Sequence, residues 1–201
     1  MTRWYSEKKR EHFYKQAKKS GYRARSSYKL LQIQKKFNVL KSNDVVVDLG
    51  AAPGGWSQVA KKIVGDNGVI VGVDLSYIRP IENIVFIKGD MTKIDNLNKI
   101  SDAINGKEVD VVLSDMSPNI SGNYVLDQAS SVYLARKALE AAESLLRKGG
   151  CFVCKVFEGQ DFEELMADIK SRFSSVRNFS PSASRKSSSE VYIVAKNFKG
   201  I

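Results

Sequence analysis

The sequence predicts an α/β protein in which helices cover both faces of a mostly parallel sheet. Apolar, β-branched runs alternate with segments of helical periodicity from residue 44 to residue 172. The runs are apolar throughout, which is typical of parallel strands that are buried on both faces. Right-handed crossovers between such strands give a doubly wound sheet. We expect strands at 45–49, 68–75, 84–90, 109–115 and 151–157.

Helices are expected between these strands and also before the first one. The segment SSYKLLQIQKKFNVL has a loosely helical spacing of apolar side chains, with Ser26 or Ser27 as a candidate N-cap. Its apolar positions are Tyr28, Leu31, Phe37 and Leu40. The crossover helices are expected near 55–64, 95–105, 126–147 and 160–172.

The C-terminal part of the chain predicts a different kind of strand pairing. SVRNFS (175–180) and SSEVYIVAKNF (188–198) are separated by a loop that is too short for a crossover helix. These two strands should therefore pair antiparallel, as a hairpin at the edge of the sheet. A parallel sheet that ends in such a hairpin is typical of Rossmann-like methyltransferases rather than of dinucleotide dehydrogenases.

Positive charge is concentrated at the N-terminus. Residues 1–41 hold 13 Lys and Arg but only two Glu, so this segment alone accounts for the net charge of +10. Trp4, Tyr5, Phe13, Tyr14 and Tyr22 are interleaved with the basic residues. Cations together with stacking rings suit a nucleic acid, whereas a solubilising tail is rarely so aromatic. We predict an RNA-binding arm at 1–22 and a single catalytic domain at 23–201.

Other features of the chain bear on its location and on whether its cysteines or its histidine could form a site. No apolar stretch is long enough to cross a membrane, and the N-terminus lacks the apolar core of a signal peptide, so we expect a cytoplasmic monomer without a membrane partner. Cys151 and Cys154 fall within one predicted strand and should point to opposite faces, so we expect neither a disulfide nor a metal site there. The single His12 lies in a basic stretch and is expected at the surface.

A glycine-rich loop follows the first predicted strand, in VVVDLGAAPGGWSQVAKKI (45–63). Its pattern is G-x-x-P-G-G, which is neither the G-x-G-x-x-G dinucleotide fingerprint nor a Walker phosphate loop. Gly50, Gly54 and Gly55 would let the backbone turn sharply and approach a ligand closely. The alternative is a plain tight turn between a strand and a helix.

Acidic residues recur at the ends of the predicted strands. Asp48, Asp74, Asp90 and Asp115 each stand at the carboxyl end of one of four consecutive strands, which is the edge where open α/β sheets bind ligands. Asp74 follows Gly54 by 20 residues, a spacing at which Rossmann-like folds hold ribose hydroxyls. Asp90 is placed to accept a hydrogen bond from an adenine amino group. Loop capping would explain any one of these residues, but not all four.

Together these motifs resemble the FtsJ (RrmJ) family of S-adenosylmethionine-dependent RNA ribose 2′-O-methyltransferases. The resemblance rests on DLGAAPGGWSQ, VGVDLS, KGDM, SDMSPN, CKVF and SRKSSSEVYIV, and runs from Arg23 to Phe198. It implies a catalytic tetrad of Lys29, Asp115, Lys155 and Glu190. It also implies that S-adenosylmethionine is bound by Gly54, Trp56, Asp74, Asp90 and Asp115, without a metal.

The tetrad that the resemblance implies makes chemical sense for a ribose hydroxyl. Lys155 could accept the hydroxyl proton as a neutral base, or orient the hydroxyl as a cation. Burial and the nearby Lys29 favour the neutral form, whereas Asp115 and Glu190 favour the ammonium, so both roles stay open. A purely structural ion-pair cluster is disfavoured, because buried ion pairs are a poor source of stability.

Three functions follow from this reasoning, in decreasing order of preference. The first is methylation of a uridine in large-subunit (23S-type) ribosomal RNA, either free or within the large ribosomal subunit. The second is methylation of a transfer-RNA anticodon loop. The third is a catalytically silent RNA-binding assembly factor, which the intact tetrad and glycine loop disfavour.

Overall fold

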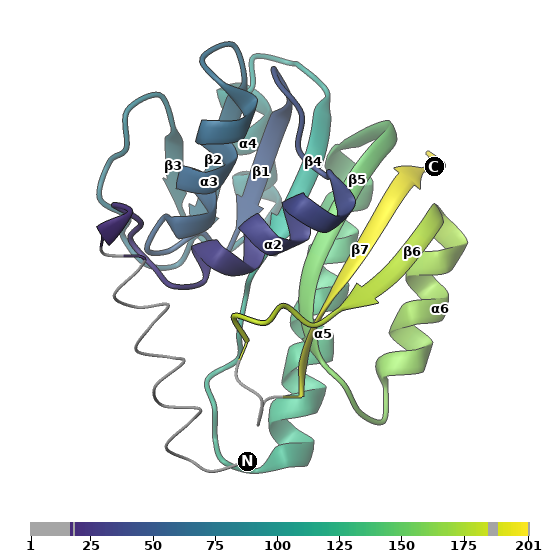
Figure 1. The fold of residues 1–201 in the computed structure, drawn as a ribbon. Coiled ribbons are helices and arrows are strands. Elements are labelled where there is room, and N and C mark those ends of the chain that lie inside the picture. The colour runs from purple at the N-terminus through teal and green to yellow at the C-terminus, as the bar shows by residue number, and fades with distance from the viewer. Residues whose placement is uncertain (1–16, 18, 185–188, 201) are drawn as a thin grey trace.

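A single seven-stranded sheet forms the centre of the molecule (Figure 1). The computed structural model describes residue 17, residues 19–184 and residues 189–200. The strands stand in the order β3-β2-β1-β4-β5-β7-β6. Their bounds are β1 Val45–Leu49, β2 Val69–Asp74, β3 Val85–Lys88, β4 Val109–Ser114, β5 Leu146–Phe157, β6 Phe173–Phe179 and β7 Glu190–Phe198.

The direction of the strands confirms the fold predicted from the sequence. Strands β3, β2, β1, β4 and β5 are parallel to their neighbours. Strand β7 is antiparallel both to β5 and to β6, so it is inserted between them with its direction reversed. The sheet is thus a Rossmann-like methyltransferase sheet with an antiparallel C-terminal hairpin, and β6 lies at its edge.

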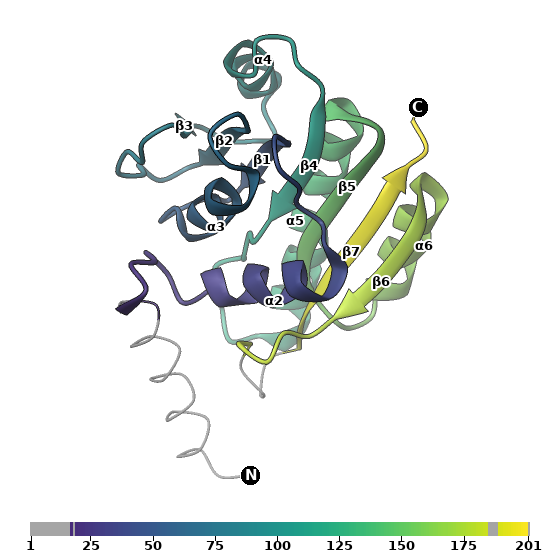
Figure 2. The ribbon, with the colours of Figure 1, turned by 45° about the horizontal axis from the view of Figure 1, so that its top comes forward.

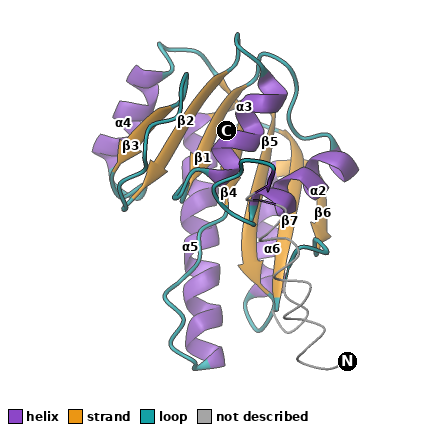
Figure 3. Ribbon diagram, turned by 60° about the vertical axis from the view of Figure 1, so that its left-hand side comes forward, coloured by secondary structure: helices purple, strands orange, loops and turns teal. Residues whose placement is uncertain are grey.

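Helices cover both faces of the sheet (Figure 2). On one face, α2 and α3 pack over a core that includes Val46 and Val111, and on the other face α4, α5 and α6 pack over a core that includes Val47 and Val112. Alternate residues of β1 therefore enter opposite cores, as the pleat of a strand requires. The helices are α2 Ser27–Phe37, α3 Gly55–Val64, α4 Ile94–Ala103, α5 Tyr124–Leu145 and α6 Phe162–Arg172. The N-terminal end of α5 extends past the sheet (Figure 3).

The two cysteines lie on opposite sides of β5, as expected. Cys154 is buried among the side chains below α4, α5 and α6, whereas Cys151 packs at the edge of the core below α2 and α3. Both thiols are free, and burial raises the pKa of each. They are therefore core residues.

Three local predictions needed correction. Strand β3 is short and Val85 is 45% exposed, because β3 is the edge of the sheet, so the expectation of uniform burial was wrong there. Strand β5 begins at Leu146, five residues before the predicted start. Ser26 occupies the N-cap position of α2 without a side-chain capping bond, whereas the buried Ser27 Oγ donates to the carbonyl oxygen of Gly55 at 3.1 Å.

Among the described residues, no helix is long and apolar enough to cross a membrane. The predicted basic arm at 1–22 falls largely outside the described residues, and so does His12. The described part of the arm packs on the body of the protein. Tyr22 makes an edge-to-face contact with Tyr28, and the ammonium of Lys62 lies 4.3 Å from the centre of the Tyr22 ring.

Candidate active site and cofactor pocket

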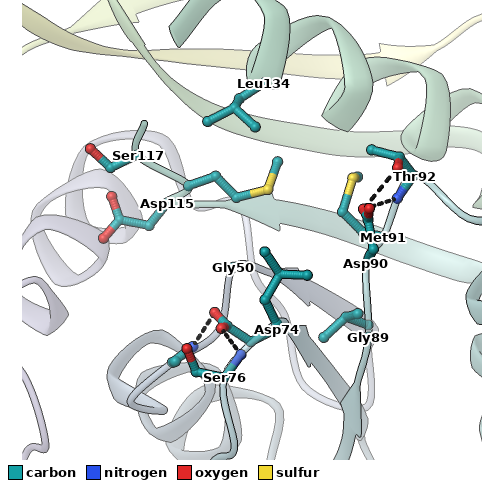
Figure 4. Close-up of a pocket in the computed structure, with 14 residues that line it drawn as sticks. Gly50, Asp74, Ser76, Gly89, Asp90, Met91, Thr92, Asp115, Ser117 and Leu134 are labelled. Atoms are coloured by element: carbon teal, nitrogen blue, oxygen red, sulfur yellow. Dashed lines mark hydrogen bonds between the residues drawn. The ribbon is translucent and has the colours of Figure 1, made fainter. Parts of the chain in front are cut away.

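A pocket of about 430 Å³ opens at the carboxyl ends of the parallel strands (Figure 4). It is built by the loops that follow β1, β2, β3 and β4, with Leu134 of α5 on one side. Its lining combines carboxylates with apolar side chains. The lining residues include Gly50, Ala52, Asp74, Leu75, Ser76, Asp90, Met91, Thr92, Asp115, Met116, Ser117 and Leu134.

Asp74 joins two of the loops that line this pocket. Its Oδ2 accepts a hydrogen bond from the backbone N–H of Ala52 at 2.9 Å, and its Oδ1 accepts one from the N–H of Ser76 at 2.7 Å (Figure 4). Each carboxylate oxygen can accept a second bond, so the side chain can still receive ligand hydroxyls. Asp74 therefore both shapes the pocket and offers acceptors in it.

Asp90 is held by the turn that follows it. Its Oδ1 accepts from the backbone N–H of Thr92 at 2.9 Å and from Thr92 Oγ1 at 2.8 Å. The backbone bond from Thr92, together with its hydroxyl, lowers the pKa of Asp90, so this carboxyl is ionised at neutral pH. An ionised carboxylate beside the apolar Met91 suits a flat heterocycle that carries an amino group.

The glycine loop passes close to neighbouring segments at Gly50 and Gly54. Gly50 has a φ of +73°, and a Cβ on it would lie 2.5 Å from Cγ of Met116. Gly54 has a φ of +104°, and a Cβ on it would lie 3.1 Å from Ile81 and 3.3 Å from the guanidinium of Arg23. Both positions therefore favour glycine for backbone conformation, and at Gly50 the lack of space excludes a side chain as well.

Two predicted cofactor residues, Gly54 and Trp56, do not line the pocket. Gly54 stands at the N-cap of α3. The Trp56 side chain is buried in the core, where its indole N–H donates to the carbonyl oxygen of Ser26 at 2.9 Å and its ring packs 5.6 Å from that of Tyr192. A cofactor contact by Trp56 would have to use its backbone N–H in the first turn of α3, where helix N–H groups lack helical partners.

Asp48 differs from the other three strand-end carboxylates because it lies below the pocket. It is 1% exposed, and Ser57 Oγ donates to its Oδ2 at 2.6 Å. No described group hydrogen-bonds to its Oδ1. Burial raises the pKa of Asp48 to about 7, and the charges of Asp115 and Asp74 add to this rise. The expectation that all four carboxylates face a ligand was therefore wrong for Asp48.

The four tetrad residues meet as two ion pairs at one end of the pocket. Lys155 Nζ donates to the backbone oxygen of Asp115 at 2.6 Å and lies 3.2 Å from its Oδ1. Lys29 Nζ lies 2.5 Å from Oε1 of Glu190. The lysine side chains are 7% and 9% exposed, for Lys155 and Lys29 respectively. These pairs are shielded from water, so their charges interact more strongly than surface pairs do.

The sheet order explains this convergence. Ser114, the last residue of β4, is paired with Cys154 of β5, so Asp115 emerges beside Lys155. Strand β7 pairs Phe157 with Glu190 on the other side of β5, and α2 carries Lys29 across the same end of the sheet. Four segments far apart in the sequence thus supply one cluster.

Tyr192 is a fifth member of the cluster, which the sequence analysis did not identify. Its hydroxyl donates to Asp115 Oδ1 at 2.6 Å, and the Lys29 ammonium lies 5.5 Å from the centre of its ring. Burial and the carboxylates of Asp115 and Glu190 raise the pKa of this hydroxyl well above its usual value. The available signal was spacing, because Tyr192 stands two residues after Glu190 on the same strand and so shares its face.

The arrangement can bind a cofactor and can accept a proton from, or orient, one hydroxyl group. The carboxylates of Asp74 and Asp90, the close backbone at Gly50, and the apolar side chains of Met91 and Met116 fit the ribose, adenine and thioether parts of S-adenosylmethionine. Lys155, which contacts Asp115, can accept the proton of an acceptor hydroxyl or orient that hydroxyl. Among the residues that the structure describes, no group of three or more His, Cys, Asp or Glu could hold a metal ion.

Known proteins that are similar to this chain carry methyltransferase names. The model of the family described as FtsJ-like methyltransferase matches residues 22–198. The chain is 49% identical to the ribosomal RNA large subunit methyltransferase E of Methanocaldococcus jannaschii, over 98% of this chain and 82% of that protein. It is 50% identical to the protein of the same name from Methanothrix thermoacetophila, over 93% of this chain and 72% of that protein.

A solved structure is similar over most of the chain. It is a Plasmodium falciparum protein assigned as a ribosomal RNA methyltransferase, with a TM-score of 0.81 and 30% identity. The match covers 90% of this chain and the whole of that one. The fold is thus shared with a protein that carries a methyltransferase name.

Proposed function

The chain belongs to the FtsJ-like methyltransferase family, and from this premise we propose that it transfers the methyl group of S-adenosylmethionine to a ribose 2′-hydroxyl of RNA. The proposed target is large-subunit ribosomal RNA, in line with the names of the relatives from Methanocaldococcus and Methanothrix. Within this RNA we propose a uridine, as the family resemblance implies. Those names favour ribosomal RNA over the transfer-RNA alternative.

One observation carries the proposal, namely that Asp115 belongs both to the cofactor pocket and to the lysine cluster. It lines the pocket, and it also accepts hydrogen bonds from Lys155 and Tyr192. An acceptor hydroxyl near Lys155 would therefore lie close to the pocket end that Asp115 lines. Holding two reactants in this way removes much of the entropic barrier to their reaction.

The residues have separate tasks in this mechanism. S-adenosylmethionine supplies an electrophilic methyl group when it is bound. Lys155, held by two oxygens of Asp115, accepts the 2′-hydroxyl proton or orients that hydroxyl toward the methyl group. The Lys29–Glu190 pair adds a second cation to the same cluster, where Lys29 lies beside the ring of Tyr192.

The N-terminal arm is the proposed source of RNA affinity. It carries seven Lys and Arg against two Glu, and phosphate contacts by Lys and Arg dominate affinity for nucleic acids. The exposed Lys35 and Lys36 at the end of α2 would extend this basic surface from the arm along the helix that carries Lys29.

The test is methyl transfer in vitro, followed by mapping of the modified nucleotide. Purified protein is incubated with methyl-labelled S-adenosylmethionine and with large-subunit ribosomal RNA, assembled large subunits or transfer RNA. The proposal expects one ribose-methylated uridine in the ribosomal RNA, and no transfer by Lys155→Ala. Lys148→Ala is the matched control, because Lys148 is an exposed lysine of the same strand. A methylated base, or labelling of transfer RNA alone, would overturn the proposal.

A further inference from the structure

Arg23 lies outside both the pocket and the lysine cluster, yet its side chain connects two loops of the cofactor site. Its Nη1 donates to the carbonyl oxygens of Pro53 at 3.3 Å and of Arg79 at 2.5 Å, and its Nη2 donates to that of Pro80 at 2.8 Å. Pro53 belongs to the glycine loop, whereas Arg79 and Pro80 belong to the connection between β2 and β3. The planar guanidinium, with five fixed donors, can serve three acceptors at once.

The connection between β2 and β3 needs such an attachment. It contains no helix, and Ile78 is the one buried side chain among residues 75–84. Its first two residues, Leu75 and Ser76, line the cofactor pocket immediately after Asp74. A loop with so little buried apolar surface gains little from packing, so its hydrogen bonds decide where it lies.

Asp74 and Arg23 bridge the same two loops from different positions. Asp74 accepts bonds from Ala52 in the glycine loop and from Ser76 in the β2–β3 connection, and it does so inside the pocket. Arg23 joins these two loops through their carbonyl groups, one residue after Ala52 and three residues after Ser76, without lining the pocket. Two separate sets of hydrogen bonds, one from Asp74 and one from Arg23, therefore hold the two loops together.

The position of Arg23 is itself fixed by α3. Its backbone N–H donates to Oε1 of Gln58 at 2.8 Å, and Nε2 of Gln58 donates to the carbonyl oxygen of Gly21 at 3.1 Å. The guanidinium also fills the space beside Gly54, where a Cβ would approach it to 3.3 Å. The backbone and the guanidinium of Arg23 are thus both attached to the segment that forms the glycine loop and the start of α3.

We propose that Arg23 is a positioning residue of the cofactor site, which holds the glycine loop and the loop after Asp74 at the separation that S-adenosylmethionine requires. It acts through these backbone segments and does not touch the cofactor. The inference rests on the proposed cofactor. It separates Arg23 from the basic residues that would contact RNA, because all three of its acceptors belong to the protein.

The experiment compares Arg23→Ala and Arg23→Lys with Arg79→Ala. Arg79 is the matched control because its exposed side chain belongs to the same connection, while only its backbone oxygen accepts from Arg23. S-adenosylhomocysteine affinity is measured by calorimetry, and kcat and the KM for S-adenosylmethionine are measured separately with RNA at saturation. Thermal unfolding without cofactor reports any effect on the fold.

We expect Arg23→Ala to raise the Kd for S-adenosylhomocysteine and the KM for S-adenosylmethionine about tenfold, since small displacements of a site are costly. The kcat at saturating cofactor should stay within about twofold, because the hydrogen bonds described for Arg23 all go to residues outside the lysine cluster. Arg23→Lys should recover part of the affinity, and Arg79→Ala should behave as wild type. Millimolar guanidinium should restore the affinity of Arg23→Ala by occupying the vacated site.

Two results would overturn the inference. One is an unchanged Kd in Arg23→Ala with a lowered Tm, which would make Arg23 a purely structural residue. The other is a loss confined to RNA affinity, which would make it an RNA contact. If the wild-type protein binds neither S-adenosylmethionine nor S-adenosylhomocysteine, the proposed function fails first and this inference fails with it.

Discussion

The two halves of the site are built in different ways. One half is the cofactor pocket, here called the cofactor half, in which Asp74 and Asp90 accept hydrogen bonds from backbone N–H groups two residues further along, at Ser76 and Thr92. The other half is the lysine cluster, here called the acceptor half, in which Lys29 pairs with Glu190, 161 positions away in the sequence. Both side chains are largely buried. The carboxylates of the first half are held partly by local turns, whereas the ion pairs of the second half depend entirely on segments that are far apart in the sequence.

Because of this difference, we expect substitutions in the two halves to affect different quantities, namely cofactor affinity and kcat. The side chains of the cofactor half would contact the cofactor and not the reacting hydroxyl, so changes there should mainly weaken cofactor affinity. In the proposed reaction the buried charges of the acceptor half lie beside the reacting hydroxyl, so changes there should mainly lower kcat. Asp115 is the residue shared by both halves, and Asp48 lies below them.

The largest effect is expected for Lys155. Lys155→Ala should lower kcat by about 10²–10⁴, the usual contribution of a general base, with near-normal binding of cofactor and RNA. Lys155→Arg keeps the charge but cannot lose its proton, so it should be nearly as inactive if Lys155 is the base. Single-turnover rates across pH would check this, and substantial activity of the Arg variant would assign Lys155 to orientation of the hydroxyl.

The next prediction concerns the buried carboxyl of Asp48. Its pKa is raised from 3.8 to about 7 in the folded protein, so between these values the native state binds the proton that the unfolded state has released. Stability should therefore fall as pH rises from about 4 to about 7, by up to about 4 kcal/mol.

Asp48→Asn removes this titration, so its unfolding free energy should depend less steeply on pH in that range. Denaturant unfolding at several pH values would measure the slope. The matched control is Asp95→Asn, at an exposed aspartate of α4. Identical slopes for wild type and Asp48→Asn would show that Asp48 ionises normally.

Asp74 tests the cofactor half. Asp74→Ala removes charged hydrogen-bond acceptors from the pocket and should weaken S-adenosylhomocysteine binding by about 50-fold, on the scale of about 2 kcal/mol for such bonds. At saturating cofactor its kcat should fall far less than that of Lys155→Ala. Calorimetry and steady-state kinetics would measure both quantities, and a variant with normal affinity but low kcat would contradict the division between the halves.

Removal of the arm tests whether RNA affinity is separate from both halves. Because Ala17 and Tyr22 pack on the body, the truncation should remove residues 1–16 only, which include five Lys or Arg. RNA affinity should fall about tenfold at moderate salt and its salt dependence should flatten. Cofactor affinity should not change. Equal RNA affinity of both proteins at every salt concentration would assign the arm to solubility.

The smallest effect is expected for Tyr192→Phe. It keeps the buried ring but removes the hydroxyl that donates to Asp115, which should cost about 1 kcal/mol of stability. Turnover should fall less than in Lys155→Ala, since Lys155 still donates to Asp115. Thermal unfolding and kcat would be compared with Tyr124→Phe, at an exposed tyrosine of α5. A loss as large as that of Lys155→Ala would make Tyr192 a catalytic residue.

Much of the fold was determined by the sequence alone. The apolar strands, the crossover helices and the antiparallel C-terminal hairpin follow from the period of apolar residues and from loop length, which are local properties of a chain. Gly50, Asp74 and Asp90 could be placed at the ligand edge for the same reason, because each directly follows or ends a strand. Their hydrogen-bond partners lie within the same loops or in the neighbouring one.

The tertiary structure alone decided which side chains share a site. It placed Asp48 below the pocket and the Trp56 ring in the core, although both stand in the glycine-loop motif. It also brought Tyr192 to Asp115 and Arg23 to the β2–β3 connection. These contacts join residues 56 to 77 positions apart. Such pairings depend on the order and register of strands and on loop packing, which the periodicity of a single segment does not encode.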